Sequence, residues 1–366
     1  MTTGSLGAVL VVLLAGVMIC VAPALTRRTL QFGVRVPGER AGAAVIRRER
    51  RAYYWRTAAA AVCCAGAAMV LAGSGLAWLT AVVLPVELAV GLACFWVARG
   101  SIAAAKNAEG WFAGRRQTVA ADTSWRTDPL RYPVVWLLPA VTVLVVTVVI
   151  GAVRYPELPT RLAVGFTASG TPDRWVGKSL WGVFSKVVGQ LWVTGLWAGL
   201  LLIIYRSRPD TDAADLADST SRYRRFLATY SRALMVLVAL VNVSLLLAAL
   251  RDWQVYRLSG IGVALPVLPA GAGLLILAAV AVRTGQAGSR LAGPPGRAPR
   301  DVNRDDDRFW KGGLIYVNRD DPAIMVGNRF GVGWTPNLGN TRACLLYGGV
   351  IAVIVALVVV RAVAGT

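Results

Sequence analysis

The side chains that could do chemistry are few, and the clearest is a carboxylate inside an apolar run. Glu87 lies near the middle of the run 76–98, where an ionised group is costly unless it is paired, protonated or hydrated. A proton- or ion-linked site at Glu87 is one interpretation. The other is a buried hydrogen bond to Lys186, to Gln190 or to a backbone carbonyl group freed by Pro85.

Lys186 and Asn242 also fall within apolar runs, which makes them intramembrane polar residues. Lys186 is a candidate partner of Glu87, because an ammonium group would compensate a buried carboxylate. Asn242 is a weaker candidate for function than Glu87, because an asparagine inside the membrane can hydrogen-bond a neighbouring helix.

The sequence carries no catalytic or metal-binding set. It has no histidine, which removes the usual general base and any Ser–His or Cys–His pair. The five cysteines lie in apolar runs, without disulfide or zinc spacing. Asp301-x-Asn303-x-Asp305 begins like a calcium loop, but Asp306 and Gly312 replace its glycine and its bidentate glutamate. We therefore expect a protein that is not an enzyme and has no catalytic residue, cofactor or metal.

Composition places the chain in the membrane. Hydrophobic residues make up 56% of the 366 residues and charged residues only 16%, whereas soluble domains carry about 25% charged residues. The net charge of +20 would suggest nucleic acid binding in a soluble protein. Here the basic residues fall in connectors between apolar runs, so membrane topology explains them and no nucleic acid partner is expected.

Eight apolar runs are long enough to cross a bilayer. They are Leu6–Leu25, Thr57–Gly73, Leu76–Ala98, Pro133–Val153, Leu180–Tyr205, Leu227–Leu250, Ser259–Val282 and Cys344–Val363. The predicted fold is an all-α integral membrane protein with about eight transmembrane helices and a small β-rich cytoplasmic module near the C-terminus.

The charge of the connectors predicts the orientation. Alternate connectors hold roughly 30 and 6 Lys and Arg residues, and the richer set is expected in the cytoplasm. That set comprises residues 26–56, 99–132, 206–226 and 283–343. Residues 1–7 carry no basic residue, so the first run is expected to be an uncleaved span. The prediction is a multi-pass cell-membrane protein with both termini outside.

The pattern of runs and connectors predicts six regions. They are a three-span region 1–132, a unit 133–205 with an outer loop 154–179, a two-span hairpin 206–283, a linker 284–304, a module 305–340 and a last span 341–366. In the module, Leu314–Val317 and Ala323–Val326 read as short strands around a turn at Asn318–Pro322, and Gly331–Thr335 as a third strand.

The outer loop 154–179 is an ordered series rather than a plain polar turn. Its prolines favour an extended Tyr155–Pro159, and Ala168–Pro172 has the composition of a turn. Arg161–Phe166 can either pair as a strand or lie on the surface. The residues expected to make an outer contact are Pro159, Phe166, Gly170, Asp173, Trp175 and Lys178.

This series resembles the domain-of-unknown-function family 1648, whose best-known members are the SdpI-type immunity proteins of Gram-positive bacteria. The matching positions are Leu158, Pro159, Phe166, Gly170, Asp173, Trp175 and Lys178. The chain departs from the family at Gly165, where histidine is common. Any chemistry or metal binding by that histidine in relatives is therefore not expected here.

A second resemblance lies near the C-terminus, to the domain-of-unknown-function family 5808. It rests on Trp310, Lys311, Gly313, Tyr316, Asn318, Asp321, Pro322, Gly331, Gly333 and Trp334. Phe32–Pro37 also resembles the stretch that follows the first span in such proteins. The Ala-, Val- and Arg-rich composition suggests a high-GC actinobacterium.

The resemblance implies a role in contact rather than in catalysis. SdpI-type proteins protect a cell from a secreted toxic peptide and can signal by sequestering a repressor at the membrane. By this resemblance, the outer loop would contact a peptide or another envelope component, and the inner module would contact a regulatory protein. We expect Asp173, Trp175 and Lys178 to make the outer contact. Membrane lipids are the remaining expected partner. A proton- or ion-linked transporter centred on Glu87, and a structural membrane scaffold, are the alternatives.

Overall fold

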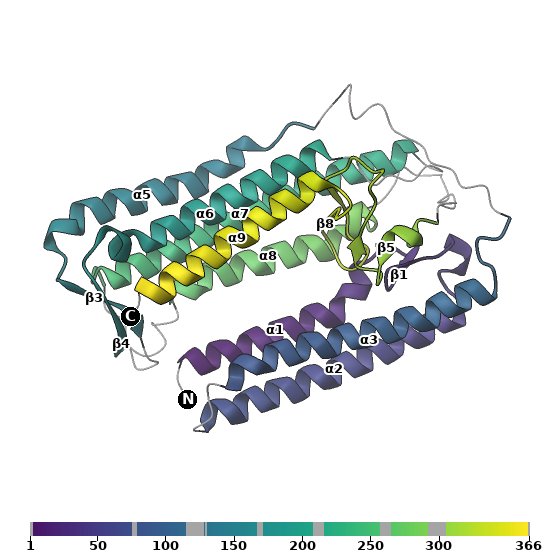
Figure 1. Cartoon of the computed structure of the whole chain (residues 1–366), viewed down its shortest axis with the longest axis horizontal. Coiled ribbons are helices and arrows are strands. Elements are labelled where there is room, and N and C mark those ends of the chain that lie inside the picture. The colour runs from purple at the N-terminus through teal and green to yellow at the C-terminus, as the bar shows by residue number, and fades with distance from the viewer. Residues whose placement is uncertain are drawn as a thin grey trace. The chain divides into compact units, whose positions relative to one another are not determined.

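The fold is dominated by long helices (Figure 1). The computed structural model describes residues 3–74, 79–114, 128, 130–166, 171–207, 216–256, 265–291 and 305–364. The α-helices in these ranges are α1 (Thr3–Leu25), α2 (Ala44–Gly73), α3 (Thr80–Ala108), α5 (Leu138–Arg154), α6 (Leu180–Arg206), α7 (Leu216–Asp252), α8 (Leu268–Thr284) and α9 (Thr341–Ala364).

These helices confirm the predicted multi-span membrane fold. In the described ranges, six segments that contain α2, α3, α5, α6, α7 and α8 are long and apolar enough to cross a bilayer. Shorter apolar stretches, Val11–Leu25 and Thr341–Ala356, lie in α1 and α9. The eight helices correspond in order to the eight predicted apolar runs.

Several helices are longer than the apolar runs that predicted them. α2 begins at Ala44, well before the run that starts at Thr57. Its basic first part buries Ile46, Glu49 and Tyr53, a spacing that keeps one helical face covered. Hydropathy detects only the part of a helix that faces lipid, which explains why the run alone underestimates α2.

The strands form four small antiparallel hairpins in the described residues. The pairs are β1 (Leu30–Gln31) with β2 (Val34–Arg35), β3 (Arg161–Phe166) with β4 (Pro172–Gly177), β5 (Trp310–Lys311) with β6 (Ile315–Tyr316), and β7 (Met325–Gly327) with β8 (Trp334–Pro336). Of the two alternatives for Arg161–Phe166, the structure shows the strand, and the β-rich character of the module is confirmed. The predicted turn at Ala168–Pro172 lies mostly outside the described residues, as does most of the linker 284–304.

Three strands of the module differ in extent from the prediction. β6 occupies only the middle of Leu314–Val317, β7 starts later than Ala323, and β8 starts at Trp334 rather than at Gly331. Strand β5, at Trp310–Lys311, was not predicted. Positive φ angles at Gly312, Gly313, Gly331 and Gly333 interrupt the extended backbone and shorten the strands.

The chain divides into two compact units. The first comprises residues 1–8, 131–202 and 228–280, and so holds α5 with most of α6, α7 and α8. Polar side chains tie its helices together. Asn242 donates to the carbonyl of Ala140 at 3.1 Å and to the hydroxyl of Thr194 at 2.9 Å. Gln190 donates to the hydroxyl of Thr147 and to the carbonyl of Asn242, each at 2.9 Å.

The second unit comprises residues 9–130, 203–227 and 281–366, and joins distant parts of the sequence. α2 and α3 pack together, and the β1–β2 hairpin lies against them through Phe32, Tyr53 and Phe95. Phe330 of the module completes this aromatic cluster, with its ring centroid 4.7 Å from that of Phe95.

The turn of the β1–β2 hairpin requires glycine at its second position. Phe32 and Gly33 have φ angles of 48° and 74°. A Cβ atom on Gly33 would lie 2.5 Å from the carbonyl oxygen of Gly313, which is closer than atoms can pack. The hairpin and the module therefore meet through bare backbone at this point.

Candidate functional site

The predicted outer loop folds as the β3–β4 hairpin. Leu162 pairs with Val176 and Ala163 with Trp175. The register shifts on both sides of Gly165, which pairs with Arg174. The position where the resembled family commonly has histidine is thus an irregularity in the strand, where glycine accommodates the backbone most easily.

A small hydrophobic core holds the hairpin on the helix ends. Leu158, Leu162 and Trp253 are almost fully buried, and the indole N–H of Trp253 donates to the carbonyl of Val183 at 3.2 Å. A Cβ atom on Gly151 would lie 2.8 Å from the Trp253 ring, so α5 approaches this tryptophan closely. The hairpin is therefore fixed on one side by apolar packing.

Lys178 fastens the hairpin to the segment that precedes it. Its Nζ atom donates to the carbonyls of Pro156 at 3.2 Å and Leu158 at 2.9 Å, and lies 5.1 Å from the ring centroid of Tyr155. Its backbone N–H donates to the carbonyl of Thr160 at 2.8 Å. These contacts show that Lys178 has a clear structural role besides the outer contact predicted for it.

A chain of charged contacts runs from the hairpin to the helix ends. The Arg251 guanidinium lies 4.4 Å from the ring centroid of Phe166 and 3.3 Å from the carboxylate of Asp252. Asp252 is also 3.2 Å from Nζ of Lys186. Phe166 therefore contacts α7 through Arg251, and the ion pairs of Asp252 continue this series of contacts to Lys186 on α6.

The outward surface of the hairpin carries a large aromatic side chain. Trp175 is 53% exposed, and Pro159 and Arg174 are exposed beside the same sheet. Asp173 belongs to β4, and Gly170 lies outside the described residues. Four of the residues predicted to make an outer contact thus lie in or next to the hairpin: Pro159, Phe166, Trp175 and Lys178. Of these four, only Pro159 and Trp175 are exposed.

Glu87 is buried in the second unit without a hydrogen-bond partner in the described part of the chain. It is 2% exposed, and neither carboxylate oxygen is bonded. A Cβ atom on Gly16 would lie 2.6 Å from Glu87 Oε1 and 2.5 Å from Cβ of Ala61, so small residues frame the carboxyl group. Among the described residues, the hydrogen bond expected for Glu87 is not formed.

The two side chains proposed as partners of Glu87 are engaged elsewhere. Lys186 pairs with Asp252, a buried carboxylate that needs a cation. Gln190 donates to Thr147 and to the carbonyl of Asn242. Lys186 and Gln190, which the sequence offered as possible partners of Glu87, thus each bond to polar groups of the first unit.

The predicted residues of the C-terminal module, defined as residues 305–340, form one hydrogen-bonded turn. Tyr316 donates to Asp321 Oδ2 at 2.9 Å, and the amide of Asn318 donates to the Tyr316 hydroxyl at 3.2 Å. The carbonyl of Pro322 accepts from Asn340 at 3.0 Å. The ring of Trp310, only 5% exposed, packs 5.1 Å from Tyr316. These residues shape the module; Trp310 and Tyr316 are buried, whereas Pro322 is exposed.

Lys311 and Trp334 lie at the edges of the module. Lys311 is exposed in β5, opposite Ile315. The Trp334 indole donates to the hydroxyl of Tyr223 at 3.3 Å, and its ring lies 5.7 Å from that of Phe226. Trp334 therefore joins the module to the first part of α7.

A buried ion cluster joins the module to the β1–β2 hairpin. Arg35 Nε lies 3.2 Å from Asp306 Oδ1, and the Arg35 backbone N–H donates to Asp307 at 3.0 Å. Arg329 bonds to both Asp306 and Asp307 and donates to the carbonyl of Gly33 at 2.9 Å. Arg329 is 1% exposed, Arg35 4% and Asp306 6%.

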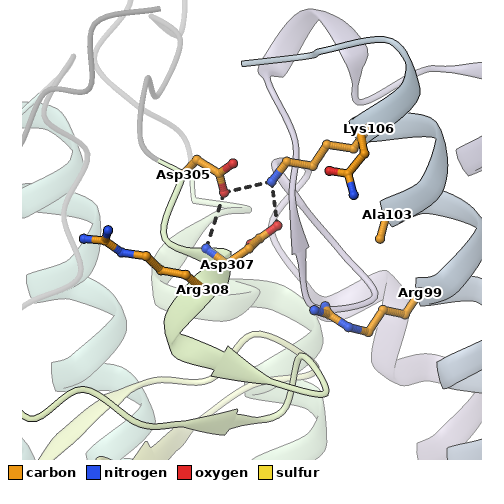
Figure 2. A pocket seen from close by; sticks show the side chains of 7 residues that line it. Arg99, Ala103, Lys106, Asp305, Asp307 and Arg308 are labelled. Carbon is orange, nitrogen blue, oxygen red and sulfur yellow. Dashed lines mark hydrogen bonds and ion pairs between the residues drawn. The ribbon is translucent and has the colours of Figure 1, made fainter. Parts of the chain in front are cut away.

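Lys106 extends this cluster to α3, as Figure 2 shows. Its Nζ atom lies 2.8 Å from Asp305 and 2.6 Å from Asp307. Lys106 is in the last turn of α3, where the helix dipole favours a cation. Three cations thus face three carboxylates, which is the condition under which buried charges are tolerated.

The cations of the cluster favour the ionised form of Asp307. Burial by itself would raise the pKa of Asp307, but Arg329 and Lys106 outweigh burial and hold that pKa below its usual range. A cavity of about 460 Å³ opens beside the cluster and is lined by Arg99, Lys106, Asp305, Asp307 and Arg308 (Figure 2). Because both signs of charge line it, the cavity has no evident preference for an anion or a cation.

The sequence patterns did not predict this cluster. Residues 305–307 fall at the start of the predicted module 305–340, and Arg35 falls in the Phe32–Pro37 stretch, with no contact predicted between them. The signal present in the sequence was charge complementarity between three consecutive aspartates and an arginine flanked by Val34 and Val36. Arg35 and Asp306 are 271 residues apart, so no local spacing connects them.

The described residues contain no group of three or more His, Cys, Asp and Glu side chains that could hold a metal ion. Two of the residues in the calcium-loop comparison, Asp301 and Asn303, lie outside the described ranges. The third, Asp305, is bonded to Lys106.

Two protein families match parts of the chain. Residues 142–188 match a Domain of unknown function (DUF1648), and residues 319–343 match a Family of unknown function (DUF5808). The first match spans most of α5, the β3–β4 hairpin and the start of α6. The second covers β7 and β8 but begins after Trp310 and Tyr316. Both family resemblances are thereby confirmed, and no curated protein or solved structure matches the chain.

The ion cluster predicts a large effect of removing one buried charge. Arg329→Met should lower the free energy of unfolding by about 3–5 kcal/mol, because Asp306 and Asp307 would lose a buried counter-ion. Arg319→Met is the matched control, since Arg319 is exposed in the same module. Unfolding of the purified protein in detergent by increasing dodecyl sulfate measures both variants. Equal stability of the two would show that the cluster contributes little.

Proposed function

We propose that this protein is a non-enzymatic membrane protein that recognises an envelope-active or toxic peptide through the β3–β4 hairpin. The observation that carries the proposal is the exposed Trp175 on a hairpin that is otherwise anchored by packing and hydrogen bonds. Exposed tryptophans are frequent anchors in recognition surfaces. The match to DUF1648, which covers this hairpin, and the resemblance to SdpI-type immunity proteins support the same function.

The hairpin geometry suits an extended peptide. β3 and β4 form a two-stranded sheet, so each strand keeps one edge that is unpaired within the described part of the sheet. A peptide can add to such an edge through main-chain hydrogen bonds, while neighbouring side chains provide selectivity. Trp175 and Arg174 would then supply aromatic and charge-assisted contacts.

The charged contacts beneath the hairpin supply a route for a signal. Phe166 touches Arg251, which pairs with Asp252, and Asp252 pairs with Lys186. Binding that displaces Phe166 would change this arrangement at the ends of α6 and α7. In the proposed function, the C-terminal module meets a regulatory protein on the cytoplasmic side, as the resemblance to SdpI-type proteins implies.

Trp175→Ala tests the outer contact directly. The variant should insert and fold normally, because the indole is 53% exposed, yet should lose most of the tolerance to the peptide that the intact protein confers. Trp55→Ala, which removes a tryptophan that is 73% exposed on α2, is the matched control. Lys178→Ala is less informative, since it also removes hydrogen bonds that fasten the hairpin.

The measurement compares a deletion strain rescued by each variant, challenged with membrane-active peptides and culture supernatants. Membrane abundance of each variant is quantified in parallel. Full tolerance with Trp175→Ala at normal abundance would contradict recognition by this hairpin.

A proton- or ion-linked transporter is the second candidate, favoured by the buried and unbonded carboxyl group of Glu87. If Glu87 carries protons, Glu87→Gln should reduce proton flux in proteoliposomes with a pH-sensitive dye to the level of protein-free vesicles. Glu109→Gln, an exposed carboxylate at the end of α3, is the control. Wild-type flux equal to that of empty vesicles, or undiminished flux in Glu87→Gln, would remove this candidate.

A further inference from the structure

A second cavity in the structure is lined by arginines and hydroxyl groups. It measures about 740 Å³ and lies where the end of α1 and the residues after it meet α2, the start of α7 and the 3-10 helix η7 (Gln286–Gly288). Its five arginines are Arg27, Arg28, Arg50, Arg222 and Arg290, and four Ser or Thr side chains complete the polar lining. All of these residues belong to the second unit.

The cavity has a marked excess of positive charge. Among the described residues that line it, none is Asp or Glu. Arg222 pairs with Asp218 one turn earlier on α7, and Arg290 donates at 2.6 Å to the carbonyls of Val282 and Ala24. These bonds hold two of the arginines in place around the cavity. An anion bound in the cavity would relieve the repulsion among these like charges.

The lining chemistry selects the class of anion. Guanidinium groups make paired hydrogen bonds to phosphate oxygens, and Ser and Thr hydroxyls add single ones. The volume is within the range of small-molecule sites, about 300–1,000 Å³. The cavity also lies beside the ends of α1 and α8, at Leu25 and Thr284, where apolar helices leave the bilayer. Basic pockets at this level can bind anionic headgroups.

We propose that this cavity binds a phosphate-bearing anion. The groups that would hold it are Arg28 and Arg50, together with Arg222 of α7 and Arg290 of the segment after α8. The anion is either a phospholipid headgroup or a soluble phosphate compound. The site is independent of the proposed peptide recognition, since the cavity and the β3–β4 hairpin belong to different units of the chain.

The test uses the purified full-length protein in neutral detergent. Binding of phosphatidylglycerol, phosphatidylcholine and inorganic pyrophosphate is measured by native mass spectrometry and by the shift of thermal unfolding. The pocket variant is Arg28→Gln with Arg50→Gln. The control is Arg51→Gln with Arg56→Gln, which removes the same charge from exposed positions of α2 outside the cavity.

The pocket variant should bind the anion at least about tenfold more weakly than wild type and the control, the loss expected for charge-assisted bonds. If the wild-type protein retains phosphatidylglycerol in preference to phosphatidylcholine and does not bind pyrophosphate, the ligand is a lipid headgroup. If it binds pyrophosphate, the ligand is a soluble phosphate compound. If the pocket variant does not fold, Arg28→Gln alone replaces it, since Arg28 is exposed. Failure of both anionic probes to bind wild type, or equal loss in pocket and control variants, would overturn the proposal.

Discussion

The buried cluster of Arg35, Arg329, Asp306 and Asp307 is the interaction on which the second unit depends. It joins a hairpin near the N-terminus to a module near the C-terminus, and Lys106 ties both to α3. Isolated charges would be too costly at this depth, but here cations and carboxylates balance and most oxygens are bonded. The aromatic contact of Phe330 with Phe95 and Phe32 adds apolar area to the same junction.

The first unit joins its helices by hydrogen bonds between neutral groups rather than by a buried ion cluster. Neutral side chains, Gln190, Thr147 and Asn242, hold α5, α6 and α7 together inside the membrane, where charges would be more expensive. Among the described residues of this unit, the ion pairs of Asp252 lie near the helix ends beneath the hairpin. The result is a firmly supported hairpin with one large aromatic side chain facing outward, an arrangement suited to recognition.

Hydropathy predicted the helices well because lipid demands long apolar runs, and the ordered series in the outer loop allowed a strand at Arg161–Phe166. The apolar run 57–73 covers only the later part of α2, since the first part of this helix is basic. The junction of Arg35 with Asp306 was beyond prediction because the two residues are far apart in the sequence. Trp175 is exposed, whereas Lys178 bonds to backbone carbonyls. The sequence could not predict this difference, because both residues belong to the same motif.

A double-mutant cycle on Arg35 and Asp306 tests the central role of the ion cluster most directly. Arg35→Met, Asp306→Leu and the double variant would be compared with wild type by unfolding in detergent with dodecyl sulfate. We expect the double variant to be more stable than the sum of the single losses implies, by about 1–3 kcal/mol, because each single change leaves the buried cluster with an excess of one sign of charge, whereas the double change restores the balance. Single losses that add to within about 0.5 kcal/mol would contradict this role of the cluster.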